Sequence, residues 1–232
     1  MPKKLGLVLG IILALSVFVT LTTVSLHWQS YDLDYFEKSF VRFGIPQDMD
    51  VDLEELMSYA VLLTDYLRGD IDSPNTYTTA RDRNGSLYGE REIVHLEDVR
   101  VLFDLSRSVE RTALAVSLII ILMAVWKKQT VAVARGTLFG GLGIVTLLAL
   151  MALMVASDFE RYFIVFHELS FSNDLWMLDP NTELLIRMFP EPFFSGMAAR
   201  ITTALAVSYA SFLGACFWVT SRDAMLKKGR SA

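Results

Sequence analysis

The sequence is almost without cysteine, because Cys216 is the single one among 232 residues. One cysteine excludes an intramolecular disulfide and a zinc site built on cysteines. It lies in an apolar run, where a small packing residue is the plain interpretation. The sequence also lacks G-x-S-x-G, H-E-x-x-H and P-loop motifs, and it has no repeat of about 20–50 residues. The usual signatures of serine hydrolases, zinc proteases, nucleotide-binding proteins and repeat proteins are therefore missing.

Charge is missing from four stretches of the chain. Hydrophobic residues make up 53% of the sequence, against roughly 45–50% in a soluble domain, and the excess is concentrated in these stretches. A helix of about 20 apolar residues crosses the hydrocarbon core of a bilayer. This composition excludes a soluble globular enzyme, a secreted disulfide scaffold and a disordered chain, and the lack of central charges argues against an ion-coupled transporter. The uncharged stretches are residues 5–26, 112–126, 136–156 and 201–220.

The charges that remain are segregated between the two sides of the predicted membrane. The N-terminus, the 127–135 loop and the C-terminal tail together hold nine Lys and Arg against one acid. Residues 28–108 hold eight bases and seventeen acids, and residues 157–200 hold three bases and seven acids. The positive-inside rule then predicts that both termini and the short loop are cytoplasmic. The first stretch exceeds a signal-peptide h-region and no A-x-A site follows it, so we expect a retained helix.

We therefore predict an all-α membrane protein with four transmembrane helices and a small extracytoplasmic cap, located in the cell membrane. The predicted order is a first span over 1–27, the cap over 28–108, a second span over 109–126, a cytoplasmic loop over 127–135, a third span over 136–156, an aromatic extracytoplasmic segment over 157–200, a fourth span over 201–220 and a cytoplasmic tail over 221–232. In the third span, Gly136-x-x-x-Gly140 matches a common helix-packing pattern.

The cap has one convincing amphipathic helix, with Asp52 or Asp50 as N-cap and Gly69 as its end. Trp28, Tyr31 and Tyr35 are typical of an interfacial aromatic belt. Residues 44–46, Gly-Ile-Pro, break any helix, and residues 70–89 read as a loop or hairpin. Helical periodicity returns near Glu90 and is expected to continue into the second span. Because so short a segment buries little core by itself, we expect the cap to rest on the membrane helices and the second outer segment.

The second outer segment is rich in aromatic residues. One interpretation is a re-entrant loop at the interface, anchored by its rings. The other is a pocket that accepts an acylated substrate. The candidate pocket residues are Tyr162, Phe163, Phe166 and Phe171.

Histidine is the usual residue for proton transfer near neutral pH, and the chain has three. His95 has Asp98 on the same helical face, where a carboxylate can fix the imidazole tautomer. His167 has candidate hydrogen-bonding neighbours in Asn173, Asp174 and Trp176. The alternative for each is a hydrogen-bonded interfacial histidine, and for His27, at the end of the first span, this alternative is favoured. His95, Asp98 and His167 allow a metal site to be drawn, but nothing in their spacing demands one.

These residues resemble a known family, the bacterial lipoprotein intramolecular transacylases and their uncharacterised membrane relatives. The resemblance covers essentially the whole chain, and its two histidine motifs are moderately specific. The matching elements are residues 44–46 before the cap helix, residues 95–103, residues 166–176, and residues 178–180 with 189–190.

The resemblance implies an enzyme that acts on a lipoprotein whose N-terminal cysteine bears a diacylglyceryl thioether. Such enzymes move the sn-2 acyl chain onto the cysteine α-amine and leave the lyso-form lipoprotein. By motif, the two catalytic histidines of the family fall on His95 and His167. The expected partners are the lipoprotein and membrane lipid, with no nucleic acid, no cofactor and no metal. The alternatives are a membrane esterase or acyltransferase for another lipid, and a non-enzymatic scaffold that binds a partner through its acidic cap.

Two expectations concern the geometry of the histidines. Both are tethered to the same outer face, so we expect their rings to meet at the cap–membrane boundary. Because Asp98 is near His95, we expect His95 to accept the proton of the amine. His167 would then serve the oxyanion or the leaving alkoxide.

Overall fold

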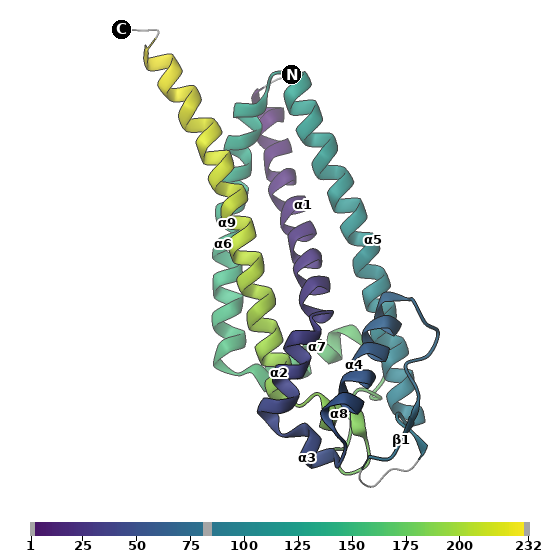
Figure 1. Cartoon of the computed structure of the whole chain (residues 1–232). Coiled ribbons are helices and arrows are strands. Elements are labelled where there is room, and N and C mark those ends of the chain that lie inside the picture. The colour runs from purple at the N-terminus through teal and green to yellow at the C-terminus, as the bar shows by residue number, and fades with distance from the viewer. Residues whose placement is uncertain (1–2, 81–84, 230–232) are drawn as a thin grey trace. The chain divides into compact units, whose positions relative to one another are not determined.

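The structure is a computed structural model that describes residues 3–80 and 85–229 (Figure 1). The chain forms two compact units. The membrane unit comprises Met1–Leu26, Arg107–Ser157 and Ile201–Ala232, and the head unit comprises His27–Ser106 and Asp158–Arg200. Asn84 of the predicted hairpin and the extreme ends of the predicted cytoplasmic termini lie outside the described residues.

Four helices in the described part of the chain are long and apolar enough to cross a membrane. They are α1 (Lys3–Ser30), α5 (Glu90–Trp126), α6 (Thr130–Ser157) and α9 (Glu191–Gly229). The predicted class, an all-α membrane protein with four transmembrane helices, is confirmed. As expected, α5 is one continuous helix from Glu90 to the end of the predicted second span. The helix that carries the predicted fourth span begins at Glu191, ten positions before residue 201.

In the membrane unit, α1 and α6 approach each other closely through glycines. A Cβ atom at Gly136 would lie 2.1 Å from the Leu7 carbonyl oxygen, and one at Gly10 would lie 2.2 Å from the Val133 carbonyl oxygen. The Thr137 hydroxyl donates to the Gly10 carbonyl at 3.1 Å. The glycine pattern at residue 136 therefore marks a real helix contact, in which small residues let two backbones pack.

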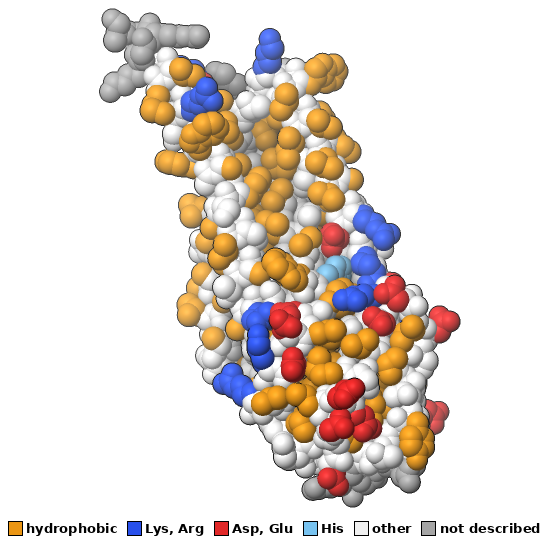
Figure 2. Space-filling view, in the orientation of Figure 1, with side chains coloured by type: hydrophobic (Ala, Val, Ile, Leu, Met, Phe, Trp, Pro, Cys, Tyr) orange, Lys and Arg blue, Asp and Glu red, His pale blue; other side chains and the backbone are white. Residues whose placement is uncertain are grey.

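Apolar side chains cover the outer surface of these helices, as Figure 2 shows along their length. Polar side chains instead bond within the bundle. The Ser117 hydroxyl donates to the Ser16 hydroxyl at 2.9 Å, and the Tyr209 hydroxyl donates to the Ala14 carbonyl at 3.0 Å. This distribution suits a hydrocarbon solvent, because polar groups there must find protein partners.

The head unit begins with three short helices, α2 (Leu33–Phe43), α3 (Ile45–Met49) and α4 (Leu53–Arg68). Gly44 ends α2 in the left-handed region at φ 67°, so the predicted helix break is confirmed there. Asp52 caps α4 by accepting the Glu55 backbone N–H at 2.8 Å, and Gly69 ends it at φ 88°, both as predicted. Helix α2 differs from the prediction, which placed Tyr35 in an interfacial aromatic belt and no helix there.

A small hairpin and two further helices complete the head unit. Strands β1 (Tyr77–Thr78) and β2 (Gly85–Ser86) pair antiparallel, which agrees with the expected loop or hairpin. In the second outer segment, α7 (Phe159–Ser170) is capped by Asp158, and α8 (Leu184–Met188) follows. Much of this segment is therefore helical and not a loop.

The head unit has a hydrophobic core of its own. Helix α2 packs on α4, and α3 packs on α8. Fully buried Phe40, Met49 and Met188 lie in this core together with Phe189. The cap does not form this core alone, because the second outer segment contributes Leu184, Met188 and Phe193 to it. The expected packing of the cap on that second segment is confirmed.

Candidate active site

The two histidines of the family motifs lie side by side in the head unit. His95 is in the second turn of α5, and His167 is in the last turn of α7. Each side chain is 8% exposed, and their ring centroids are 6.1 Å apart. The predicted approach of the two rings, 72 positions apart in sequence, is confirmed.

Aromatic rings enclose this histidine pair. Phe163 lies 4.3 Å from the His167 ring centroid, Trp176 lies 4.9 Å from it, and Phe166 meets it edge-on at 5.4 Å. Phe171 contacts both imidazoles, at 5.3 Å from His95 and 5.6 Å from His167. Three of the four predicted pocket residues, Phe163, Phe166 and Phe171, therefore contact His167. The Trp176 ring is a fourth contact.

One predicted pocket residue stays outside this cluster, and one ring was missed. Tyr162 is half-buried in α7 but makes no ring contact with either imidazole in the described structure. Phe163 lies four residues before His167 and therefore on the same face of α7, whereas Tyr162 is one position further back and faces elsewhere. Phe194 packs on Phe163 with ring centroids 5.2 Å apart and extends the cluster from α9.

The loop after α7 is held against α5 at two points that bracket His95. Arg91 donates to the backbone carbonyl of Asp174. Asp98 accepts from the Asn173 side-chain amide at 2.8 Å. The Trp176 indole N–H donates to the Asn173 carbonyl at 3.0 Å, so the same loop orients the ring that stacks on His167. Asn173, Asp174 and Trp176 thus lie in the loop beside the histidine pair, but His167 Nδ1 bonds the Phe163 carbonyl and not one of these three residues.

The expected hydrogen bond between Asp98 and His95 is not formed. The Asp98 carboxylate lies one turn after His95 but binds Asn173 instead. Among the described residues, His95 Nδ1 is buried and has no hydrogen-bond partner. Within the described part of the chain, Asp98 therefore does not fix the His95 tautomer. The reason is that the loop after α7 places the Asn173 amide within reach of the Asp98 carboxylate.

His167 has a defined tautomer. Its Nδ1 lies 2.7 Å from the backbone carbonyl oxygen of Phe163, one turn earlier in α7. A carbonyl oxygen only accepts, so Nδ1 carries the hydrogen, and in the neutral ring Nε2 carries the lone pair.

Both imidazoles are held in the neutral form at pH 7. They belong to the head unit, and His95 precedes the uncharged part of α5 by more than a dozen residues. Burial, followed by the neighbouring His167 ring, lowers the pKa of His95 from 6.5 to about 4, while Asp98 partly opposes this shift. Burial also lowers the pKa of His167, and the bond to the Phe163 carbonyl opposes it. Neutral imidazoles are the form that accepts protons.

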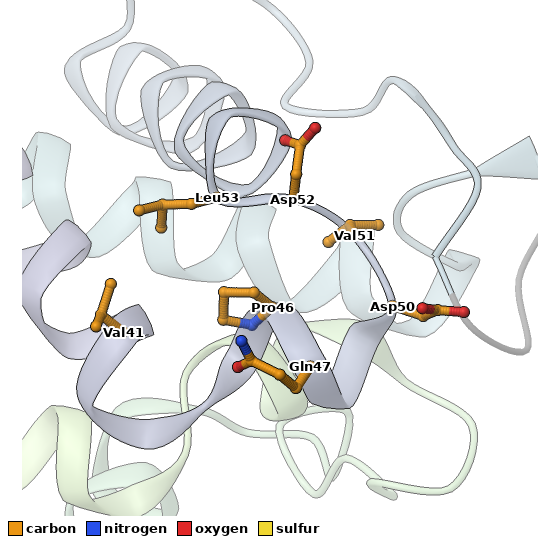
Figure 3. Close-up of a pocket in the computed structure, with 7 residues that line it drawn as sticks. All are labelled: Val41, Pro46, Gln47, Asp50, Val51, Asp52 and Leu53. Atoms are coloured by element: carbon orange, nitrogen blue, oxygen red, sulfur yellow. The ribbon is translucent and has the colours of Figure 1, made fainter.

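Two other features lie apart from the histidine pair. His27 contacts Ser106 through Nε2 at 2.7 Å and stacks on Tyr31 and Phe103, which agrees with its structural interpretation. A surface cleft of about 620 Å³ contains none of the predicted site residues. Figure 3 shows its lining, which comes from α2, α3 and the start of α4: Val41, Pro46, Gln47, Asp50, Val51, Asp52 and Leu53.

The described residues also contain no group of three His, Cys, Asp or Glu side chains placed to hold a metal ion. The alternative metal site from His95, Asp98 and His167 is therefore not assembled in them.

The fold and the site together define an integral membrane protein with a buried, aromatic-lined imidazole pair in its head unit. The model of the lipoprotein intramolecular transacylase (Lit) family matches residues 10–194 of the chain. The chain belongs to this family, and its function is intramolecular transacylation of lipoproteins.

Solved structures of the Bacillus cereus lipoprotein intramolecular transacylase share this fold. One has a TM-score of 0.73 and 22% identity, with 100% of each chain covered. A form with a histidine-to-alanine mutation has a TM-score of 0.70 and 20% identity, covering 99% of this chain and 97% of that one. A histidine-to-arginine form has a TM-score of 0.70 and 21% identity, with 99% and 96% covered. No curated protein sequence matches the chain.

Proposed function

We propose that His95 and His167 together perform the acid–base chemistry of the transacylation. The reaction moves the sn-2 acyl chain of a diacylglyceryl lipoprotein onto the α-amine of its N-terminal cysteine. The observation that carries the proposal is the pair of buried rings with centroids 6.1 Å apart. Catalytic groups must come within hydrogen-bond reach of the protons they move, directly or through one water. Two rings at this separation satisfy that condition around one reacting ester.

His167 is the residue we assign as proton acceptor for the amine. Its Nδ1 is bound to the Phe163 carbonyl, so its Nε2 lone pair is available. The sequence favoured His95 for this role because of Asp98, but Asp98 binds Asn173. We therefore assign the role of proton acceptor to His167, because a hydrogen bond sets its tautomer.

His95 then serves the leaving group. The amine nitrogen attacks the ester carbonyl carbon, a C–N bond forms, and His167 takes the proton of the amine. The bond to the glycerol oxygen breaks next, and this oxygen needs one proton. The His95 imidazole, whose Nδ1 is unpartnered in the described structure, hydrogen-bonds the glycerol oxygen and relays the proton taken by His167. One ester becomes one amide and one alcohol, with no external acyl donor or cofactor.

Apolar side chains beside the pair suit an acylated substrate. Leu169, two residues after His167, is 83% exposed, and Phe166 and Met177 are also exposed. Such side chains bind acyl chains through burial of apolar area. Both reacting groups belong to one lipoprotein molecule, so holding it in place supplies much of the rate. The net charge of the chain is −5, so it repels the phosphates of nucleic acid, and we propose no nucleic-acid partner.

We also propose the orientation expected from the charges. The basic termini and the 127–135 loop are cytoplasmic, and the acidic head unit is extracellular. Figure 2 shows acidic side chains over one face of the head unit. The lipoprotein substrate would then meet the histidine pair outside the cytoplasm.

The experiment replaces each histidine by glutamine in the full-length protein. His95→Gln and His167→Gln are expected to lose at least about 100-fold in transacylase activity, the usual contribution of acid–base catalysis. His27→Gln is the matched control and should keep its activity, because His27 lies apart from the pair. Mass spectrometry of lipoprotein N-termini measures the lyso-form. Full activity in both site variants with unchanged thermal stability would refute the two-histidine mechanism.

A further inference from the structure

The most unusual polar group near the histidine pair is the guanidinium of Arg91. Its Nε is buried and has no hydrogen-bond partner among the described residues. One terminal nitrogen donates to the backbone carbonyl of Asp174, and no described carboxylate pairs with the side chain. A buried donor on a charged group is destabilising unless an acceptor oxygen fills its place. The Arg91 Nε–H therefore lacks the acceptor oxygen that a buried charged donor needs.

Arg91 and His95 share one face of α5. They are four positions apart, so their Cβ atoms lie about 5–6 Å from each other. His95 Nδ1 is the other buried, unpartnered nitrogen on this face. The loop that Arg91 holds through Asp174 also carries Trp176, whose ring contacts His167. The unfilled donor thus belongs to the helix face that carries His95, and one side of its guanidinium is fixed by the backbone.

Other arginines of the head unit show what a satisfied guanidinium looks like. Arg187 donates from Nε to the Asp48 carboxylate at 3.0 Å and from Nη2 to the Asp48 carbonyl at 2.8 Å. Arg200 donates from Nε to the Gln29 side chain at 2.8 Å and also binds Asp32. Arg91 shares the backbone contact of Arg187 but lacks its carboxylate. Arg91 thus differs from Arg187 and Arg200, because its Nε alone among these three has no acceptor in the described structure.

We propose that Arg91 is a catalytic residue whose guanidinium stabilises the oxyanion of the transacylation. The inference rests on the proposed two-histidine function. When the amine attacks the ester carbon, the π electrons of the carbonyl move onto its oxygen, which becomes negative. The Arg91 Nε–H donates to this oxygen while His167 takes the amine proton. When the C–O bond to glycerol breaks, the electron pair on the oxyanion re-forms the C=O bond of the new amide. Arg91 is in the same state after the reaction as before it.

The first experiment compares Arg91→Lys with Arg187→Lys in the purified full-length protein. Lysine keeps the positive charge but has no equivalent of Nε–H in a planar fork. Losing one oxyanion donor is expected to lower kcat by about 10²–10³-fold with KM nearly unchanged. Arg187→Lys loses the same kind of backbone contact away from the site and should keep its kcat. A rise in KM alone, with kcat retained, would show that Arg91 only positions the loop.

A second measurement tests the oxyanion contact without turnover. The probe is a diacylglyceryl-cysteinyl lipopeptide in which a phosphonate replaces the sn-2 ester, since a tetrahedral anion mimics the transition state. Its affinity should fall in Arg91→Lys by about the same factor as kcat/KM, whereas the ester analogue with a blocked amine should bind equally well. Equal loss for both ligands, or for neither, would overturn the inference even if the variant were inactive through misfolding of the loop. An inactive wild-type protein would instead overturn the proposed function, and the inference with it.

Discussion

The Nδ1 of His167 lies 2.7 Å from the carbonyl oxygen of Phe163, its neighbour one turn earlier in α7. The ring is therefore oriented by its own helix rather than by a distant acid. Phe163 also covers the imidazole face, with ring centroids 4.3 Å apart, so one residue both orients and shields the base. By contrast, His95 relies on packing and has no partner for Nδ1 among the described residues. The two imidazoles of the pair are not equivalent, which is why we assign them different roles.

Asp98 and Asn173 are hydrogen-bonded to each other, so we expect them to act together in holding the loop after α7 that carries Trp176. Asp98→Ala and Asn173→Ala remove the same contact from opposite sides, so each should lower activity several-fold. The double variant should have about the same kcat/KM as the less active single variant, because the energies of residues in contact are not additive. Measuring kcat/KM for the wild type, both single variants and the double variant completes this double-mutant cycle. If the loss in the double variant equals the product of the two single losses, the two side chains act independently.

The lowered pKa values predict how the protein responds to acid. A histidine whose pKa is below 6.5 when folded is neutral in both states above pH 6.5, so it costs the fold nothing there. As the pH falls below 6.5, the unfolded state binds the proton first and the fold is destabilised. For His95, with a pKa of about 4, the loss between pH 6.5 and 4 is of the order of 3 kcal/mol. The lowered pKa of His167 acts with the same sign.

Thermal denaturation in detergent checks this prediction. The wild-type protein should lose more of its Tm between pH 7 and pH 4 than the variant carrying His95→Gln and His167→Gln. Equal losses of Tm in both proteins would contradict the neutral histidine pair.

The glycine contact in the membrane unit can be tested with a matched pair of substitutions. A Cβ at Gly136 would lie 2.1 Å from a backbone oxygen of α1, whereas a Cβ at Gly143 meets no atom within 4 Å. Gly136→Ala should therefore cost about 1–3 kcal/mol through overpacking. Gly143→Ala should be neutral or stabilising by up to about 1 kcal/mol, because alanine favours helix. Comparing the two Tm values in one detergent checks this, and equal values would refute the close contact.

The proposed orientation predicts which sites an impermeant thiol reagent can reach. In a Cys216→Ser background, Ser86→Cys lies on an exposed strand of the head unit and should label from outside intact cells. Ser231→Cys, in the basic tail, should label only after the cells are permeabilised. Labelling of the tail from outside would invert the topology that the basic residues predict.

The sequence by itself determined the features that depend on near neighbours. Four uncharged stretches predicted the four long helices, because a bilayer requires about 20 apolar residues in a row. Asp52 and Gly69 predicted both ends of α4, because an N-cap carboxylate and a left-handed glycine act within one turn. The four-residue spacing of Arg91 and His95 was also visible in the sequence. It did not predict a role for Arg91, because that role depends on which groups its guanidinium contacts in the fold.

The tertiary structure decided which distant groups meet. The predicted topology placed His95 and His167 on the same side of the membrane, but their 6.1 Å separation depends on how α7 packs beside α5 within the head unit. It also decided that Asp98 binds Asn173 and that Arg91 has a free Nε. A hydrogen bond depends on distances of a few tenths of an ångström, here between residues 75 and 83 positions apart in the sequence. Local periodicity carries no information at that precision. The candidate site is therefore a product of the fold, assembled from residues whose types the sequence had already singled out.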